Sequence, residues 1–175
     1  MAPAAVAVSV REIAASEFDE AALFALLKDC VDGGASIGFL VPLTESEGRD
    51  YWRAVKRDLG NGRLLLGAYV ERRLVGTVQL EPATKRNARH RAEVQKLMVL
   101  HAHRGRGIGK ALMAAIERKA AELGRWLLVL DTAAAQPAEK LYERLGYVRA
   151  GVVPDYAERS GGGFDPTVIF YKRLR

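Results

Sequence analysis

A glycine-rich stretch at residues 104–109, Arg-Gly-Arg-Gly-Ile-Gly, has the composition of an anion-binding loop. It lies between an apolar run at 97–100 and a stretch at 110–123 whose apolar residues have helical spacing. At a strand-to-helix junction, glycines let backbone N–H groups and the positive end of the helix dipole converge on a negative charge. The stretch therefore favours a pyrophosphate cradle, and a tight turn that needs glycine only for its conformation is the alternative.

Two common phosphate-binding motifs do not fit this stretch. A P-loop requires glycine five residues before its Gly-Lys pair and Ser or Thr after it, whereas Arg104 and Ala111 occupy those positions. A dinucleotide fingerprint requires the spacing G-x-G-x-x-G, but residues 105–109 have the spacing G-x-G-x-G. The pattern that remains is R-x-x-G-x-G.

Positive charge is concentrated in the sequence around this loop. Residues 85–110 contain eight basic residues and one acid, Glu93, a net charge of +7 in a chain of net charge +6. The basic residues are Lys85, Arg86, Arg89, Arg91, Lys96, Arg104, Arg106 and Lys110. Phe, Tyr and Trp are absent between residues 81 and 125, so the patch lacks the stacking platforms of single-strand binders. We therefore predict that the patch surrounds the loop and binds a small multiphosphate ligand, with no nucleic-acid partner. Some of Lys85, Arg86 and Arg89 are expected to be solvated surface only, and low-affinity nucleic-acid binding is the alternative function of the patch.

The rest of the sequence predicts the elements that position this loop. Alternating or continuously apolar runs predict strands at 6–13, 63–71, 73–82, 92–100, 126–131, 146–153 and 166–174. A first helix is predicted at 17–31 with Ser16 as its cap, and a second begins at a Thr44–Glu47 capping box and ends at Gly60. A third helix is predicted from the glycine-rich loop to Gly124, and a fourth from Pro137 to about Leu145. The order β-α-α-β-β-β-α-β-α-β-β is an α/β fold with a parallel pair, between residues 92 and 131, at the centre of a mixed sheet.

Composition limits the class of protein. With 175 residues, of which 49% are hydrophobic and 27% charged, the chain is predicted to form one globular domain, 1–175. No apolar run approaches the roughly 20 residues that cross a bilayer, and the N-terminal apolar stretch has no basic residue before it, so we expect a cytoplasmic protein without a membrane partner. Cys30 is the only cysteine and lies in an apolar helical pattern, which favours a core role over a nucleophile.

The residues Arg104, Gly107 and Gly109 resemble the acyl-CoA-binding signature of the GNAT N-acetyltransferases, Gln/Arg-x-x-Gly-x-Gly/Ala. The predicted element order also resembles that fold across nearly the whole chain, with about seven strands and four helices. Four blocks, GGASIGF, RAEVQKLMVL, LLVLDT and DPTVIFYK, resemble the tabtoxin-resistance branch of the family. Many members have Pro where His101 stands and Asn where Ala135 stands, so a cofactor contact from that Asn is not carried over.

The resemblance implies acetyl-CoA as cosubstrate. The residues implied to hold it are Leu97, Met98, Val99, Arg104, Gly105, Arg106, Gly107, Ile108, Gly109 and Lys110. In the family, backbone N–H groups near 97–99 also stabilise the charge that develops on the thioester carbonyl. We predict no metal, because His101 and His103 form a lone H-x-H without a third ligand nearby.

Acetylation of an amine also requires a proton acceptor. A free α-amine has a pKa of about 8 and a lysine about 10.4, so a base assists at neutral pH. Glu93 occupies the strand position where some GNAT enzymes have a general base that often acts through water, and it is the sole acid in the basic stretch. The alternative is an ion pair between Glu93 and Arg91 or Lys96.

Two further residues are implied to take part. Tyr142 matches the family tyrosine that commonly protonates the leaving thiolate, and its alternative role is as a core aromatic. Asp131 ends an apolar strand beside the expected site. It could bind the acceptor ammonium or share the role of base, and it could equally cap the following helix.

The acceptor is expected to enter between two glycine-rich loops, GGASIGF at 33–39 and SGGGFDP at 160–166, with ordinary surface connections as the alternative. If the first loop is a lid, Ser36 can bind a polar acceptor and Phe39 can form a wall of its site. The resemblance implies direct transfer of acetyl to a primary amine of a small molecule, such as an amino-acid-like toxin or antibiotic. Acetylation of protein lysines or N-termini, and a non-catalytic CoA-binding domain, are the alternatives. The sequence leaves open whether the protein forms a homodimer.

Overall fold

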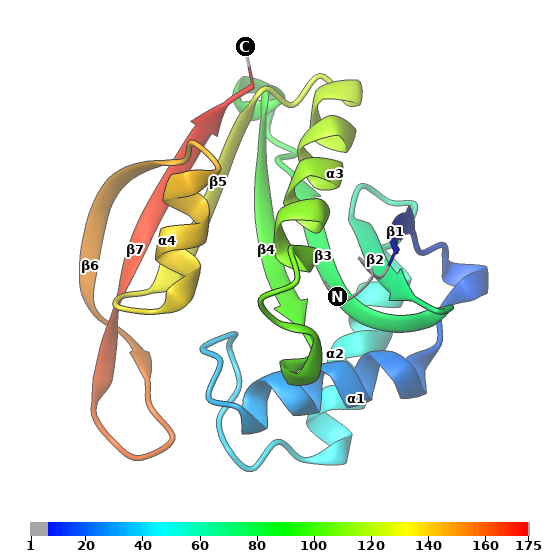
Figure 1. The fold of residues 1–175 in the computed structure, drawn as a ribbon. Helices are drawn as coiled ribbons and strands as arrows, with labels where there is room; N and C mark the ends of the chain where they lie inside the picture. The colour runs from blue at the N-terminus through cyan, green and yellow to red at the C-terminus, as the bar shows by residue number, and fades with distance from the viewer. Residues whose placement is uncertain (1–6, 175) are drawn as a thin grey trace, which may run out of the picture.

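A seven-stranded sheet forms the centre of the computed structural model, which describes residues 7–174 (Figure 1). Its strands are β1 (Val8–Glu12), β2 (Leu64–Val70), β3 (Arg73–Pro82), β4 (Arg91–Val99), β5 (Leu127–Ala133), β6 (Val148–Glu158) and β7 (Phe164–Arg173). Its helices are α1 (Glu20–Asp32), α2 (Glu45–Asp58), α3 (Ile108–Glu122) and α4 (Pro137–Arg144). This order confirms the predicted α/β fold. Within the described residues, no helix is long and apolar enough to cross a membrane.

The strands lie in the order β1-β2-β3-β4-β5-β7-β6, and β4 and β5 form the parallel pair. That pairing is short, since it comprises only Arg91 with Leu127, Ala92 with Leu128 and Glu93 with Val129. Beyond Glu93 the two strands separate, as Figure 1 shows below their point of contact. The edge of β4 from residue 94 to 99 therefore has no strand partner on the β5 side.

Two hydrophobic cores cover opposite faces of the sheet. On one face, α3 buries Ile108, Leu112 and Ile116 in a cluster that also contains Tyr142 of α4. On the other face, α1 and α2 bury a cluster that contains Leu23 and Trp52, each with no exposed side-chain surface. Residues from both faces, at the end of α1 on one side and in α3 and α4 on the other, line the space where β4 and β5 separate.

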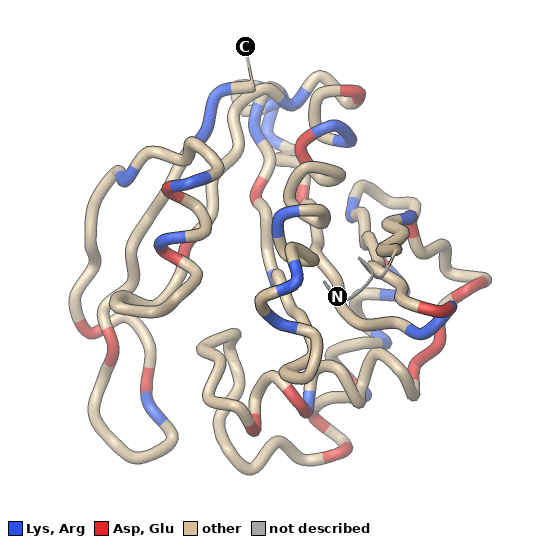
Figure 2. Tube along the Cα trace, viewed as in Figure 1, with Lys and Arg blue, Asp and Glu red and all other residues tan. Residues whose placement is uncertain are grey.

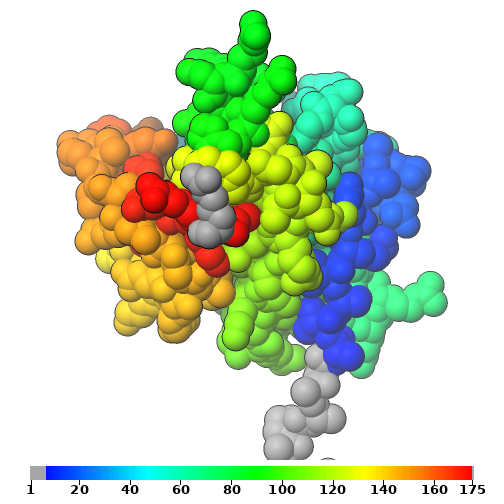
Figure 3. Space-filling model, turned by 90° about the horizontal axis from the view of Figure 1, so that it is seen from above, coloured from blue at the N-terminus to red at the C-terminus, as the bar shows by residue number. Residues whose placement is uncertain are grey.

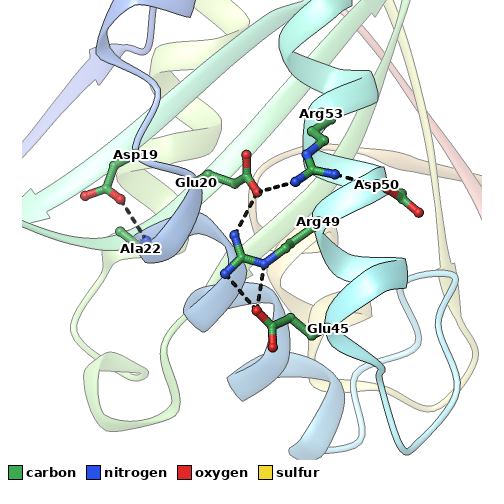
Figure 4. A network of polar contacts seen from close by, with 7 residues as sticks. All are labelled: Asp19, Glu20, Ala22, Glu45, Arg49, Asp50 and Arg53. Atoms are coloured by element: carbon green, nitrogen blue, oxygen red, sulfur yellow. Dashed lines mark hydrogen bonds and ion pairs between the residues drawn. The ribbon is translucent and has the colours of Figure 1, made fainter.

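The starts of the first two helices test the predicted caps. The Thr44–Glu47 capping box is confirmed, because the Glu47 N–H donates to Thr44 Oγ1 at 3.2 Å and the Thr44 N–H donates to Glu47 Oε2 at 3.1 Å. The prediction that Ser16 caps the first helix is wrong, because Ser16 lies inside a short 3₁₀ turn, Ala15–Glu17. Asp19 caps α1 instead by accepting the Ala22 N–H at 3.0 Å (Figure 4).

Ion pairs join the same two helices. Arg49 of α2 contacts Glu20 of α1 at 3.0 Å and Glu45 of its own helix at 2.8 Å (Figure 4). Arg53, one turn further on, approaches the same Glu20 oxygen at 3.7 Å. Such partly exposed pairs contribute at most about 1 kcal/mol each, so they orient α1 against α2 more than they stabilise the fold.

Candidate active site

The separation of β4 and β5 opens a cavity of about 980 Å³. It is lined by Glu93 and residues 97–99 of β4, by residues 104, 105 and 107–110 of the glycine loop and α3, and by Asp131, Tyr142 and Ser36. Its volume is at the upper end of the range for small-molecule sites. Most of the residues singled out in the sequence thus face one space.

Two of the predicted residues do not line this cavity. Arg106 is exposed on the outer side of the glycine loop. Phe39 packs its ring edge against Tyr51 of α2, with 5.2 Å between the ring centroids, and contributes to the core beneath α1 and α2. Within the loop at 33–39, Ser36 therefore faces the cavity and Phe39 anchors the loop.

The glycine loop has the conformation of a tight turn and leaves open space beside it, while the pyrophosphate cradle stays a prediction. Gly105 and Gly107 have φ angles of 73° and 78°, a left-handed conformation that favours glycine, so the turn needs these residues for its shape. A Cβ on either residue would meet no atom within 4 Å, so the space beside them is open. Gly107 is the N-cap of α3 and supplies no capping side chain, which leaves N–H groups of the first turn available to an anion.

Arg104, the basic residue of the signature, points back into the protein. Its Nε donates to the carbonyl oxygen of Val99 at 3.1 Å, and its Nη2 lies 3.9 Å from Cys30 Sγ. The guanidinium thus connects the loop to the end of β4 and to α1.

Cys30 is 1% exposed, which confirms the prediction that it is a core residue. Burial raises the pKa of its thiol, and the nearby Arg104 opposes that shift.

The basic stretch of the sequence is divided in space. Lys85, Arg86 and Arg89 belong to the connection before β4, which projects from the body of the protein in Figure 3. The glycine loop follows the other end of β4, a strand of nine residues or roughly 25 Å. Figure 2 shows the two groups of cations separated along β4. The prediction that the whole patch surrounds the loop is wrong, because a strand between two basic segments holds them apart.

Glu93 and Asp131 lie where β4 and β5 separate. Glu93 is the last residue of β4 that pairs with β5, and its carboxylate makes no ion pair within residues 7–174. The alternative of an ion pair with Arg91 or Lys96 is therefore wrong. Asp131 Oδ2 and the carbonyl oxygen of Thr132 each lie 3.0 Å from the hydroxyl of Thr167 in β7, which can donate its proton to either. The alternative of a helix cap is also wrong, because β5 continues past Asp131 and α4 has Gln136 as its N-cap.

Tyr142 contributes both to the core and to the cavity. Its side chain is 6% exposed, and its ring packs against Tyr147 and Phe170 with centroid distances of 5.8 and 5.9 Å. Burial, with a smaller contribution from Asp131, raises the pKa of Tyr142 to about 12. No group in the described part of the chain forms a hydrogen bond with its hydroxyl, which lies beside the cavity.

Thr167 and Lys96 line the cavity at positions that the sequence analysis does not predict. Thr167 is 2% exposed and orients Asp131, and no pattern in the sequence indicates this contact. Lys96 also lines the cavity, and a signal for it is present, since Gln95 and Lys96 place two polar residues in succession within an alternating strand. Such a break in alternation indicates a β-bulge.

A family model of the acetyltransferase (GNAT) family matches residues 21–147, nearly three quarters of the chain. The chain belongs to the GNAT acetyltransferase family. This GNAT protein is thus an acetyl-CoA-dependent N-acetyltransferase by family, and the recognition of that family from the sequence is confirmed.

Solved structures share the fold over almost the full chain. A "putative phosphinothricin N-acetyltransferase" has a TM-score of 0.82 at 22% identity, covering 97% of this chain and 99% of that one. A ribosomal-protein-alanine N-acetyltransferase from Brucella melitensis has a TM-score of 0.78 at 24% identity, covering 95% and 99%. The "putative acetyltransferase" yncA from Salmonella typhimurium, solved with its cofactor acetyl-CoA, has a TM-score of 0.78 at 18% identity, covering 97% and 95%.

The two departures from the family pattern are accommodated locally. His101 stands where many members have Pro, and its N–H, which Pro lacks, donates to Asp29 of α1 at 2.8 Å. Ala135 stands where many members have Asn, at a φ of 61°, a region in which Asn is enriched. Across residues 7–174, no group of three or more His, Cys, Asp or Glu side chains is arranged to hold a metal ion.

Proposed function

We propose that the protein transfers acetyl from acetyl-CoA directly to a primary amine of a small, amino-acid-like molecule, without a covalent acyl-enzyme. The observation that carries this proposal is the single cavity that joins the glycine loop to Glu93, Asp131 and Tyr142. The uncapped start of α3 and the open space at Gly105 and Gly107 fit a pyrophosphate. Lys110, which lines the cavity beside them, adds positive charge.

Glu93 is proposed to accept the proton of the acceptor ammonium. Its freedom from ion pairs leaves both carboxylate oxygens available, either to the amine itself or to an intervening water. Asp131 is proposed to bind the same ammonium, because Thr167 already holds one of its oxygens in place. The two carboxylates lie on strands that separate at this point, so an amine can approach between them.

Tyr142 and the free edge of β4 are proposed to stabilise the charges that develop during transfer. When bound, acetyl-CoA supplies a thioester that the free amine attacks, and CoA leaves as a thiolate. Full proton transfer from a phenol of pKa about 12 to a thiolate whose parent pKa is about 8.5 costs about 5 kcal/mol. Tyr142 therefore acts mainly as a hydrogen-bond donor to the sulfur. Backbone N–H groups of residues 97–99, along the unpaired edge of β4, are suited to the carbonyl oxygen.

A hydrogen bond between the two connections that contain the glycine-rich loops supports a small acceptor over a protein. The N–H of Val41, in the connection between α1 and α2, donates to Ser160 Oγ, in the connection between β6 and β7, at 2.9 Å. This hydrogen bond joins the two connections that carry the glycine-rich loops, and we propose that it restricts access for a protein acceptor. The names of two structural neighbours support different acceptors, since one is a ribosomal-protein acetyltransferase and the other is described as acting on phosphinothricin.

An amine library with detection of the free CoA thiol tests the proposal. The library includes β-lactam amino acids, which would support a role in toxin resistance, and a peptide array tests lysines and N-termini in parallel. Transfer to small amines with no transfer to peptides supports the proposal, and the reverse favours protein acetylation. Absence of both transfer and hydrolysis across both sets would leave a non-catalytic CoA-binding domain.

We also propose a cytoplasmic homodimer that uses β6. This strand lies at the edge of the sheet and exposes Val148, Val152, Val153 and Tyr156. Exposed apolar side chains along an edge strand favour pairing with a second chain. Sedimentation velocity measures the oligomeric state, and a monomer at micromolar concentration would contradict this part of the proposal.

A further inference from the structure

Lys96 lies at a bulge in β4. Pairing with β3 passes from Gln95 opposite Gln79 to Met98 opposite Thr77, so the two residues between them on β4 face one on β3. The φ of Lys96 is 51°, in the left-handed region that residues other than glycine rarely adopt. Before the bulge Ala92 and Val94 pack beneath α3, and after it Leu97 and Val99 do so. The bulge thus reverses the alternation of the strand.

The ammonium of Lys96 faces the acceptor side of the cavity. Its Nζ comes within 3.3 Å of the position that a Cβ on Gly38 would occupy, and Gly38 belongs to the loop at 33–39. Within residues 7–174 this ammonium makes no hydrogen bond and no ion pair. Burial lowers the pKa of Lys96, while Asp131 and Glu93 act in the opposite direction and favour the charged form. The cavity wall therefore carries two carboxylates and a cation that has no direct partner.

We propose that Lys96 binds a carboxylate or similar anionic group of the acceptor, while Glu93 and Asp131 receive its ammonium. This inference rests on the proposed N-acetyltransferase function and narrows it to amines that also carry a negative charge. A partly buried ammonium without a partner is unfavourable, and an anionic group on the acceptor supplies that partner. A plain amine or a polyamine would leave Lys96 unpaired, so the same residue disfavours such acceptors.

Matched pairs of acceptors test the assignment. The probes are the proteinogenic amino acids and the corresponding amino-acid amides, with kcat/KM measured by release of the CoA thiol. Acids and amides differ in the pKa of their amines, so the informative quantity is the acid-to-amide ratio of each variant compared with the wild-type ratio. Lys96→Met should lower that ratio at least tenfold, about 1.4 kcal/mol, and change kcat/KM for the amides by less than about twofold.

Two further variants separate binding from an indirect effect. Lys96→Arg keeps the charge and should keep most of the preference for acids, whereas Lys140→Met, on the exposed surface of α4, should leave it unchanged. The Kd of acetyl-CoA should stay within about twofold in all three. A Lys96→Met variant that loses the same factor with acids and amides would show that Lys96 only tunes the carboxylates, and would overturn the proposal.

A binding measurement decides the question without turnover. Calorimetry on the CoA-saturated protein compares N-acetyl amino acids with their amides, since the product keeps the carboxylate. We expect tighter binding of the acids to the wild type and equal binding to Lys96→Met. Equal binding of acids and amides to the wild type contradicts the role of Lys96 even if small amines are acetylated. Preferential binding of acids without any transfer would instead contradict the proposed function alone.

Discussion

The two ends of the cavity are built from different parts of the chain. On the cofactor side, the determinants are backbone features: the left-handed Gly105 and Gly107, and the uncapped N–H groups of α3. On the acceptor side, they are the side chains of Glu93, Asp131 and Lys96. Backbone recognition tolerates variation of the neighbouring side chains, whereas side-chain recognition changes with single substitutions. Under the proposed function, we therefore expect the fold to determine the donor and a few side chains to determine the acceptor.

This difference predicts that substitutions at the two ends affect different constants. Changes on the cofactor side should alter the Kd of acetyl-CoA, and changes on the acceptor side should alter the KM of the amine. Substitutions of Glu93, which is also the proposed base, and of Tyr142 should in addition lower kcat. A substitution that weakens both ligands equally would break the comparison.

The largest effect is expected for Glu93→Gln, which should lower kcat/KM about 100-fold or more at pH 7. The amide cannot accept a proton, so the loss should shrink as the pH rises toward the pKa of the acceptor amine, where free amine is abundant. A pH profile of kcat/KM for both proteins measures this. Wild-type rates for the variant at pH 7 would remove Glu93 from the mechanism.

Tyr142→Phe should lower kcat by about 10- to 100-fold, because the hydrogen bond to the leaving sulfur is lost. The free energy of unfolding should change by less than about 1 kcal/mol, because the buried ring is retained.

The raised pKa of Tyr142, about 12, predicts a pH dependence of the wild type. Tyr142 stays protonated as the pH passes 10, where an ordinary tyrosine ionises, and loses its proton only near pH 12. Stopped-flow rates should therefore show no loss at pH 10 that depends on Tyr142.

Gly107→Val should raise the Kd of acetyl-CoA at least tenfold, about 1.4 kcal/mol, because its Cβ would enter the space beside the start of α3. Gly124→Val is the matched control. Gly124 follows the other end of the same helix, with a φ of 70° and open space around its Cβ, so its backbone strain is similar. Calorimetry should show weaker acetyl-CoA binding for Gly107→Val alone. Equal losses in the two folded variants would attribute the effect to strain.

Ser36→Ala should raise the KM of the acceptor several-fold and leave the Kd of acetyl-CoA within about twofold, since Ser36 lines the cavity. Phe39→Ala separates the two roles within that loop. Because Phe39 packs against Tyr51, its loss should lower the free energy of unfolding by about 1 kcal/mol and affect the acceptor less directly. Urea unfolding of both variants checks this division. A destabilised Ser36→Ala would contradict it.

Much of the fold could be predicted because periodicity and glycine mark the element boundaries. The strand predicted at 146–153 is nevertheless too short, since β6 continues to Glu158 through Pro154. Proline removes a backbone donor and normally ends a strand, but β6 lies at the edge of the sheet, where one side needs no partner. Edge position is a property of the tertiary arrangement, which the local sequence does not encode.

The candidate site divides in the same way. The glycine loop could be predicted from the sequence, because the spacing of its glycines indicates the conformation of the turn. The sequence predicts Lys96 only as a member of the basic patch or as an ion-pair partner of Glu93, because the direction of its side chain depends on a bulge that reverses the alternation of β4. The basic stretch at 85–110 forms one patch in the sequence only, because nearness in sequence does not imply nearness in space. A strand is the most extended connection that a chain can form, so the prediction of one patch fails at β4.

The short pairing of β4 with β5 has a consequence for hydrogen exchange. Beyond the bulge at Lys96, the N–H groups of β4 alternate between those that bond to β3 and those that face the gap. The amides facing the gap have no strand acceptor and should exchange with deuterium much faster than their neighbours. A bound thioester ligand would protect only that alternate set. Residue-resolved exchange along β4 would thus record, as a pattern with a period of two residues, which edge of the strand the cofactor covers.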